Sequence, residues 1–432
     1  MPWSRGQDDT GDGTMVKLRL SVMMFAQYFA WGVWLVPLGT YMSKGLHFDT
    51  IIGTTFGLIG IATILSTLFI GMVADRFMAA QKLLGILSLG AGGALFWVST
   101  IQSSPSLFLF GCLLHFLFYA STIPLATAIA FNAIEDTSKE FPAIRVWGTI
   151  GWIVAGLLVG VISGAAETAL PMQMAAGVYI LLGLYSFTLP DTPPRARHKV
   201  VSVAAIFGLD VILRHRETAF WVFIACTLAL MVPKSFYDTY ANAFFADKDL
   251  HMTLFGGRLE ATGIQTAGQI FETFFLISLP FLLAKLGIKR VLVIGMGAWA
   301  VRFVLFGFGY QGDTAIMPML LLGIIIHGIC YDFLIVSGQI YVDRKFDAQS
   351  RARAQAFLTL ITQGIGIVVG SNIAGYVYGL YADPAGGHDW RAIWMVPAVI
   401  AFVTMVLFAL AFREKLAAAP AEDGGASAPA GS

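Results

Sequence analysis

The chain has 432 residues, of which 57% are hydrophobic and only 12% charged, and its mean hydropathy is +0.76. This composition excludes an ordinary soluble globular protein and indicates an integral membrane protein. The formal net charge of +1 also argues against nucleic acid as a partner, because such a partner needs a concentrated basic surface.

Apolar stretches long enough to cross a bilayer recur along the chain. A helical span needs about 20 apolar residues. The first such stretch follows Lys17 and Arg19 and is longer than the core of a cleavable signal peptide, so we expect it to be retained as a span. Twelve spans are predicted, at residues 18–42, 52–74, 83–102, 105–131, 145–166, 169–189, 219–246, 261–284, 290–311, 315–342, 354–381 and 391–412.

The longest polar connection separates the sixth span from the seventh. We therefore predict an all-α membrane protein with 12 transmembrane helices in two pseudo-symmetric six-helix bundles, the architecture of many secondary transporters. Similar short basic turns after the second and eighth spans, at residues 71–77 and 285–290, agree with two related halves. The predicted parts are residues 1–189, a cytoplasmic linker at 190–218, residues 219–416 and a disordered cytoplasmic tail at 417–432, rich in Ala, Pro, Gly and Ser.

The distribution of basic residues predicts the orientation. If the amino terminus is cytoplasmic, 21 of the 27 Lys and Arg residues fall on the inner side and only four on the outer side. This bias follows the positive-inside rule and predicts that both termini are cytoplasmic.

Five charged residues interrupt the apolar spans: Lys234, Asp238, Glu272, Arg302 and Asp332. A charge at the centre of a bilayer costs a few kcal/mol or more, so such residues usually face a protein-lined cavity and handle substrate, ions or protons. The chain is therefore a transporter candidate.

Two motifs carry a resemblance to known transporters. Residues 71–76 (GMVADR) resemble the loop between the second and third helices of the major facilitator superfamily, and residues 141–151 (FPAIRVWGTIG) are similar to the fifth-helix motif of its bacterial nucleoside:proton symporter family. Gln27 to Trp34, Gln269 to Thr273, and Tyr331 to Phe333 extend the resemblance over almost the whole chain.

The resemblance implies a major facilitator fold and proton-coupled import of nucleosides by alternating access, in a bacterial inner membrane and without a cofactor. A proton-coupled carrier of a sugar, glycoside or other small polar metabolite is the alternative. A membrane sensor or enzyme is disfavoured, because no nucleophile paired with a base, metal cluster or Walker-type phosphate loop is visible in the sequence. The three cysteines, in three different apolar segments, have no metal-ligand spacing and predict free thiols. We expect a monomer surrounded by membrane lipid.

The fifth span presents Arg145, Thr149 and Trp152 at i, i+4 and i+7, on one helix face. The resemblance implies that the arginine and threonine bind nucleoside and that the third position packs an aromatic ring against the base. A guanidinium offers several donors, and a large ring suits stacking on a nucleobase. The alternative for Arg145 is a positive-inside anchor at the helix end.

The eighth span presents Gln265, Gln269 and Glu272 with the same spacing. Carboxamides donate and accept hydrogen bonds, and a carboxylate accepts two hydroxyls or exchanges a proton. The resemblance implies substrate-binding roles for Gln269 and Glu272, and Glu272 is a candidate for proton coupling. Alternatively, this face only bonds neighbouring helices.

The seventh span places Lys234 four residues before Asp238, so that the two can pair along the helix. The sequence departs here from the family pattern, which carries neutral amides at positions aligned with Ser235 and Asp238. Asp238 is a candidate for substrate binding and proton coupling, and the pair is also a candidate structural clasp.

The tenth span offers His327, Tyr331 and Asp332. The family places aromatic residues at the first two positions, so His327 is a second departure, although an imidazole still stacks and titrates. Asp332 is predicted to pair with Arg302 of the ninth span, because an intramembrane arginine needs a counter-ion, and is a further candidate for proton coupling. Gly71, Asp75 and Arg76 are predicted to form a gating loop.

Overall fold

The computed structural model describes residues 9–73, 78–193, 202–254, 256–383 and 387–413. The first half contains α1 (Asp9–Leu35), α2 (Leu38–Thr40), η1 (Tyr41–Gly45), η2 (Asp49–Ile51), α3 (Ile52–Val73), α4 (Ala80–Val98), α5 (Pro105–Tyr119), α6 (Thr122–Ala133), α7 (Thr137–Val161), η3 (Ala165–Glu167) and α8 (Leu170–Ser186). Two short helices follow, α9 (Val203–Ile206) and α10 (Leu209–Ile212). The second half contains α11 (Thr218–Asp247), β1 (His251–Leu254), β2 (Gly257–Glu260), α12 (Ala261–Phe308), β3 (Tyr310–Gln311), β4 (Thr314–Ala315), α13 (Met317–Ile325), α14 (His327–Tyr331), η4 (Asp332–Val336), α15 (Ser337–Lys345), α16 (Arg351–Thr359), η5 (Leu360–Ile365), α17 (Gly366–Leu380) and α18 (Trp390–Ala411).

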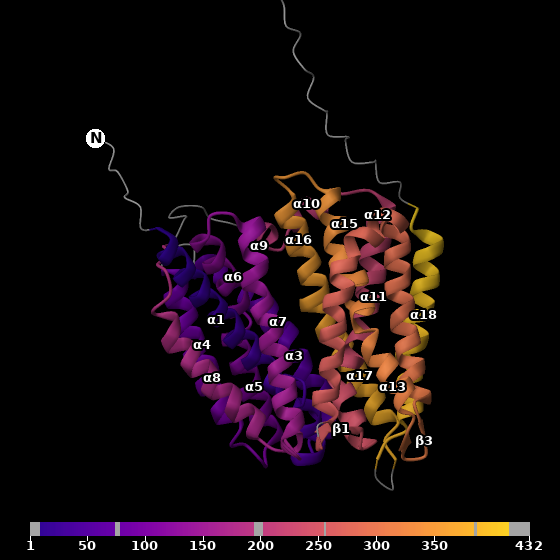
Figure 1. The fold of residues 1–432 in the computed structure, drawn as a ribbon. Helices are drawn as coiled ribbons and strands as arrows, with labels where there is room; N and C mark the ends of the chain where they lie inside the picture. The colour runs from indigo at the N-terminus through magenta and orange to yellow at the C-terminus, as the bar shows by residue number, and fades with distance from the viewer. Residues whose placement is uncertain (1–8, 74–77, 194–201, 255, 384–386, 414–432) are drawn as a thin grey trace, which may run out of the picture.

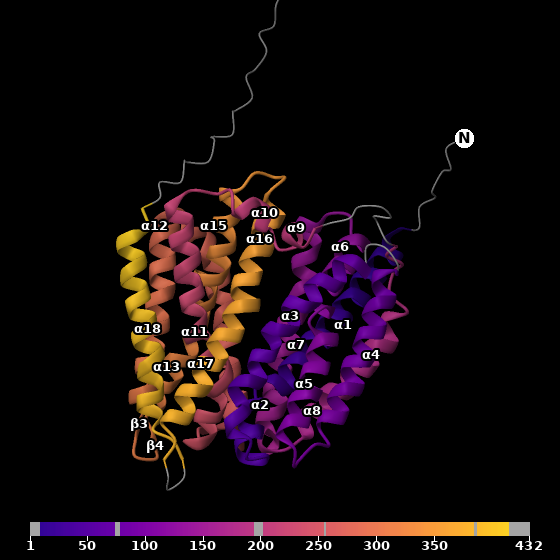
Figure 2. The same ribbon diagram turned by 180° about the vertical axis from the view of Figure 1, so that it is seen from behind.

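The helices form two bundles that stand side by side (Figure 1). One bundle contains α1 to α8, and the other contains α11 to α18. The start of α1, the end of α18 and the connecting helices α9 and α10 all lie at one end of the molecule, as the reverse view in Figure 2 also shows. The two antiparallel hairpins, β1 with β2 and β3 with β4, lie at the opposite end.

Among the described residues, nine helices are long and apolar enough to cross a membrane, or ten if the bent pair Met317–Ile325 and His327–Lys345 is one span. The 48-residue helix α12 contains two spans joined at a break, and α8 is a shorter apolar helix of 17 residues. Counted in this way, the described chain is consistent with the twelve predicted spans.

Several spans are broken where the backbone cannot continue as a regular helix. In α12 the break is Gly287, whose φ of 76° and ψ of 162° suit glycine alone. The predicted span 105–131 divides into α5 and α6, and Pro124 lies in the first turn of α6, where it lacks an N–H to donate to the preceding helix. The bend of 41° in the tenth span falls at Ile326, directly before His327.

The two bundles pack closely at the end that carries the β1–β2 hairpin. A Cβ added to Gly160 of α7 would lie 2.4 Å from Gly263 Cα of α12, and one added to Gly53 of α3 would lie 2.5 Å from the Ser371 carbonyl oxygen of α17. Only glycine permits such close approach between helix backbones.

Hydrogen bonds between the bundles also cluster at this end. Thr40 Oγ1 donates to Asn242 Oδ1 at 2.6 Å, and Lys44 Nζ donates to the Ala246 carbonyl oxygen at 2.7 Å. The glycine contacts and these hydrogen bonds close the space between the bundles on the hairpin side.

Candidate functional site

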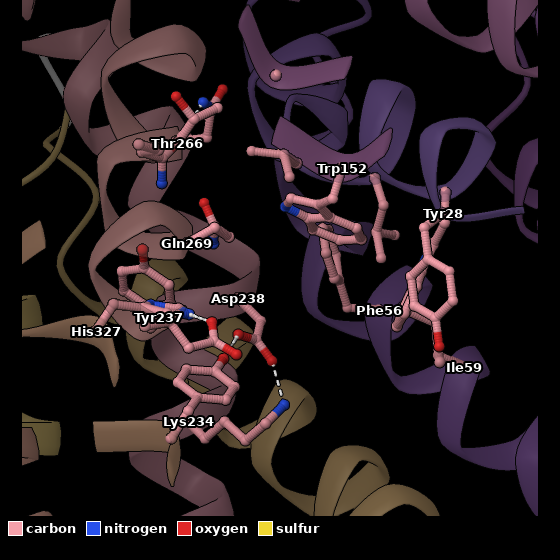
Figure 3. A pocket seen from close by; sticks show the side chains of 18 of the residues that line it. Tyr28, Phe56, Ile59, Trp152, Lys234, Tyr237, Asp238, Thr266, Gln269 and His327 are labelled. Atoms are coloured by element: carbon pink, nitrogen blue, oxygen red, sulfur yellow. Dashed lines mark hydrogen bonds and ion pairs between the residues drawn. The ribbon is translucent and has the colours of Figure 1, made fainter. Parts of the chain in front are cut away.

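A cavity of about 330 Å³ lies between the two bundles, within the usual size range of small-molecule sites. Residues from both halves line it, and Figure 3 shows Trp152 and Tyr28 facing Lys234, Asp238, Gln269 and His327 across it. The lining residues are Tyr28, Trp31, Leu35, Val36, Phe56, Ile59, Arg145, Thr149, Trp152, Gly156, Lys234, Ser235, Tyr237, Asp238, Asn242, Thr262, Gln265, Thr266, Gln269, Glu272, His327, Tyr331, Gln363, Ile367 and Ser371.

The wall of the first bundle is built on α7 and α1. The predicted face of α7, with Arg145, Thr149 and Trp152, lies on the cavity, because residues at i, i+4 and i+7 share one side of a helix. The Arg145 guanidinium lies 4.1 Å from the ring centroid of Tyr28, and the Trp152 ring meets Trp31 edge-on at 5.1 Å between centroids. Aromatic rings therefore hold both large side chains of this wall in place.

The wall of the second bundle contains a linked group of charged and phenolic side chains. Lys234 Nζ lies 2.5 Å from Asp238 Oδ2, so the predicted pairing along the helix is present. The Tyr331 hydroxyl donates to the other oxygen, Asp238 Oδ1. The ammonium is also 5.5 Å from the Tyr331 ring centroid.

The predicted pair Gln269 and Glu272 lines the same wall. Glu272 Oε2 lies 3.5 Å from His327 Nε2, and the His327 ring stacks on Tyr331 with 4.2 Å between centroids. The Glu272 side chain is 35% exposed, whereas that of His327 is only 6% exposed. The Glu272 carboxylate is therefore open to the cavity, while the His327 imidazole next to it is buried in the wall.

Gln265 lines the cavity, but its side chain is bonded to a neighbouring helix. Its Oε1 accepts from Asn242 Nδ2 at 2.6 Å, and the same amide donates to Thr262 Oγ1 at 2.9 Å. Since Asn242 also accepts from Thr40 of the first bundle, Gln265 connects the cavity to the contact that closes its hairpin side.

The predicted ion pair between Arg302 and Asp332 is wrong. Arg302 is fully buried, its Nε donates to the Gly323 carbonyl oxygen at 2.9 Å, and its guanidinium lies 4.3 Å from the Tyr237 ring centroid. Asp332 Oδ2 is buried without a hydrogen-bond partner among the described residues, and Asp332 does not line the cavity. The physical reason is that aromatic faces and a backbone carbonyl stabilise the guanidinium instead of a carboxylate.

The predicted gating loop is only partly described. Gly71 lies in the last turn of α3, whereas Asp75 and Arg76 lie outside the described residues. The predicted tail at 417–432 also lies outside them. Within the described chain, no group of three or more His, Cys, Asp or Glu side chains has the geometry of a metal site.

Several cavity residues were missed by the sequence reasoning, among them Tyr28, Gln363 and Ser371. Tyr28 lies three residues before Trp31 and shares its helix face, a spacing that could have identified it. Gln363 and Ser371 are polar residues within an apolar span, which is a weaker signal because such residues often serve helix packing.

The cavity thus combines aromatic surface with charges of both signs. Arg145 and Lys234 supply donors, Asp238 and Glu272 supply acceptors, and Gln269 supplies both. Such a site can recognise a neutral polar molecule that has a flat ring and several hydroxyl, carbonyl or amine groups.

Comparison with known proteins decides the family. A family model described as the nucleoside H+ symporter matches residues 14–417. The chain belongs to the nucleoside H+ symporter family. This symporter is 37% identical to YegT of Escherichia coli (strain K12) over 407 residues, which cover 92% of this chain and 93% of YegT. It is 30% identical to the xanthosine permease of the same organism over 406 residues, covering 92% of this chain and 96% of the permease.

The symporter also matches a solved structure. The crystal structure of the nucleoside transporter NupG superposes with a TM-score of 0.82 at 28% sequence identity, and covers 93% of this chain and all of that one. The predicted family and major facilitator fold are therefore confirmed, and the symporter is a transporter rather than an enzyme.

Proposed function

We propose that the cavity is the nucleoside site of this symporter, and that substrate and proton cross the membrane together as the two bundles alternate about it. The observation that carries the proposal is the convergence of both walls on one space. Arg145, Thr149 and Trp152 come from α7, and Gln269 and Glu272 come from α12. A site shared between bundles senses their relative movement, which alternating access requires.

The chemistry of the walls suits a nucleoside. Trp152 offers a broad π face for a base, and Arg145 and Gln269 offer donors for ribose hydroxyls or base carbonyls. Among the described residues, only His327 lies within ion-pair distance of the Glu272 carboxylate, at 3.5 Å, so its oxygens have lone pairs free to accept the two ribose hydroxyls. Because protonation of Glu272 would change both its charge and its hydrogen bonding, it is our principal candidate for coupling substrate to protons.

We further propose that the chain is a monomer in a bacterial inner membrane, with both termini cytoplasmic. The positive-inside bias supports this orientation. Because the bundles meet at the hairpin end, opposite the termini, we infer that this state is closed toward the outside and accessible from the cytoplasm.

Uptake into proteoliposomes tests the proposal. Labelled uridine, adenosine and xanthosine should accumulate when the exterior is acidified, and a protonophore should abolish the accumulation. A panel of sugars and glycosides serves as the control for the alternative cargo. Gradient-driven uptake of a sugar but of no nucleoside would refute the proposal.

A further inference from the structure

We propose that Lys234, held in place by Asp238 and Tyr331, selects nucleosides whose base presents a carbonyl oxygen over nucleosides that carry an amino group at the same position. The inference rests on the proposed function, and it names the class of substrate that this particular site prefers. Uridine and inosine belong to the preferred class, whereas cytidine and adenosine are their disfavoured counterparts.

The position of the ammonium is fixed by its neighbours. Lys234 Nζ donates to Asp238 Oδ2 at 2.5 Å and lies 5.5 Å from the Tyr331 ring centroid. Its side chain is only 9% exposed, yet Lys234 lines the cavity, so the exposed part is the part that faces substrate. Figure 3 shows the Lys234 ammonium beside Asp238 on the wall opposite Trp152.

The Lys234 ammonium keeps hydrogen-bond donors available for a substrate. An ammonium has three donors and no acceptor. One donor is used by Asp238, and the other two have no hydrogen-bond partner among the described residues. Both oxygens of Asp238 already accept, one from Lys234 and the other from Tyr331. Each oxygen keeps a second lone pair, but the carboxylate already accepts two hydrogen bonds. An incoming group therefore meets two unused charged donors beside a carboxylate that is partly engaged.

A carbonyl oxygen satisfies those donors, and an exocyclic amine does not. The carbonyl accepts a charge-assisted hydrogen bond from the ammonium, which is stronger than a neutral one. The amine instead places its own N–H groups against the positive charge and leaves buried donors unpaired, a cost that a polar site imposes on a mismatched ligand. The same wall thus attracts one group and repels the other.

The environment of Glu272 favours a pose in which the base, and not the ribose, lies next to Lys234. Glu272 is 35% exposed, and in the part of the chain that the structure describes only His327 lies within ion-pair distance of it, at 3.5 Å, so Glu272 is the better acceptor for ribose hydroxyls. Asp238, by contrast, already accepts one hydrogen bond at each oxygen. With the ribose at Glu272, the polar edge of the base is the substrate group left to meet Lys234.

Equilibrium binding to the purified, full-length protein tests the inference with two matched pairs of ligands. Uridine differs from cytidine, and inosine from adenosine, mainly by a carbonyl in place of an amino group. We expect the carbonyl member of each pair to bind about tenfold more tightly or better. In Lys234→Met both ratios should fall to within about twofold, because the donors are gone. Lys248→Met is the matched control and should keep the wild-type ratios. Lys248 follows the last residue of α11 at the hairpin end, also pairs with an aspartate and is 12% exposed, but it does not line the cavity.

A folding defect in Lys234→Met would not leave the question open. Lys234→Gln keeps a polar group of similar length, and the double variant Lys234→Met with Asp238→Asn removes both charges together. Either variant should also lose the preference. If wild-type protein binds none of the four nucleosides, the proposed function itself fails. If it binds them with ratios near one, or if the ratios survive in the Lys234 variants, the inference is overturned while the proposed function stands.

Discussion

We expect the Glu272 side chain to matter more for accumulation of nucleoside against a gradient than for binding of nucleoside. It faces the cavity, and its Oε2 lies 3.5 Å from His327 Nε2. Glu272→Gln mimics a permanently protonated side chain and cannot exchange a proton. We expect exchange of nucleoside between two equal pools to persist, while gradient-driven accumulation falls by about tenfold or more.

Counterflow and acid-driven uptake, measured on the same proteoliposomes, separate these two effects. Glu135→Gln, an exposed carboxylate between α6 and α7, is the control and should accumulate normally. Normal accumulation by Glu272→Gln would show that another group carries the proton.

We expect the two members of the Lys234–Asp238 pair to contribute unequally to the stability of the protein. The Lys234 side chain is 9% exposed and that of Asp238 is 33% exposed. Removing one member of a buried pair leaves the other charge uncompensated, and the cost rises with the burial of that remaining charge. Asp238→Asn should therefore lower the thermal unfolding temperature more than Lys234→Met, with losses of about 1 to 3 kcal/mol because water still reaches Asp238.

The double variant of these two substitutions should be more stable than Asp238→Asn alone, since no unpaired charge remains. Thermal unfolding of all three variants in one detergent provides the comparison. Equal unfolding temperatures for the two single variants would contradict the asymmetry.

For single residues, the sequence predicted a position in the site correctly where that position follows from helix periodicity. Arg145, Thr149 and Trp152 share a face because of their spacing alone, and Lys234 reaches Asp238 for the same reason. The partner of Arg302 was mispredicted, because it depends on how separate helices pack. Its guanidinium rests on the Tyr237 ring, a contact between residues that no spacing rule connects.

Among the helices, apolar length predicted which segments form spans, but it gave their bounds unevenly and did not give their breaks. The predicted span 145–166 corresponds to α7 at Thr137–Val161. Helix α11 spans Thr218–Asp247 against a predicted 219–246. By contrast, the eighth and ninth spans follow each other within α12 with only a break at Gly287 between them, and the tenth span bends by 41°. Hydrophobicity measures contact with lipid, whereas a break depends on local backbone geometry and on the neighbouring helices.

The crossing of α7 and α12 predicts a substitution that biases the access state. A Cβ at Gly160 would lie 2.4 Å from Gly263 Cα, and a backbone atom cannot move aside as a flexible side chain would. Gly160→Ala should destabilise the state closed at the hairpin end by about 1 to 3 kcal/mol, the usual cost of overpacking. Because 1.4 kcal/mol is tenfold in an equilibrium, we expect about a fivefold to 150-fold shift toward the opposite access state.

Spin labels placed on the two bundles at the hairpin end would report this shift as a longer distance. Gly177→Ala in α8 is the matched control, because nothing lies within 4 Å of its added Cβ. An unchanged distance distribution in Gly160→Ala would mean that the helices absorb the methyl group without separating.

For the whole molecule, one contact region between the bundles bears on both the shape of the site and its access, and it separates two cavities. A second cavity of about 450 Å³ at the hairpin end shares Asn242 and Thr262 with the central one. The Thr40–Asn242 hydrogen bond lies at this division, and Asn242 also bonds Gln265 on the central wall. Movement of the bundles that breaks this bond would therefore both open the hairpin side and alter the central cavity.

Thiol accessibility tests the orientation and the open side together. In a background with the native cysteines replaced by alanine, Thr149→Cys places a thiol in the central cavity and Ser163→Cys places one in the second cavity. A membrane-impermeant maleimide should label Thr149→Cys from the cytoplasmic face and Ser163→Cys from the external face. Bound nucleoside should slow the first reaction only. If both variants react from the external face, the resting state opens outward, and if the two faces are exchanged, the orientation of the chain is inverted.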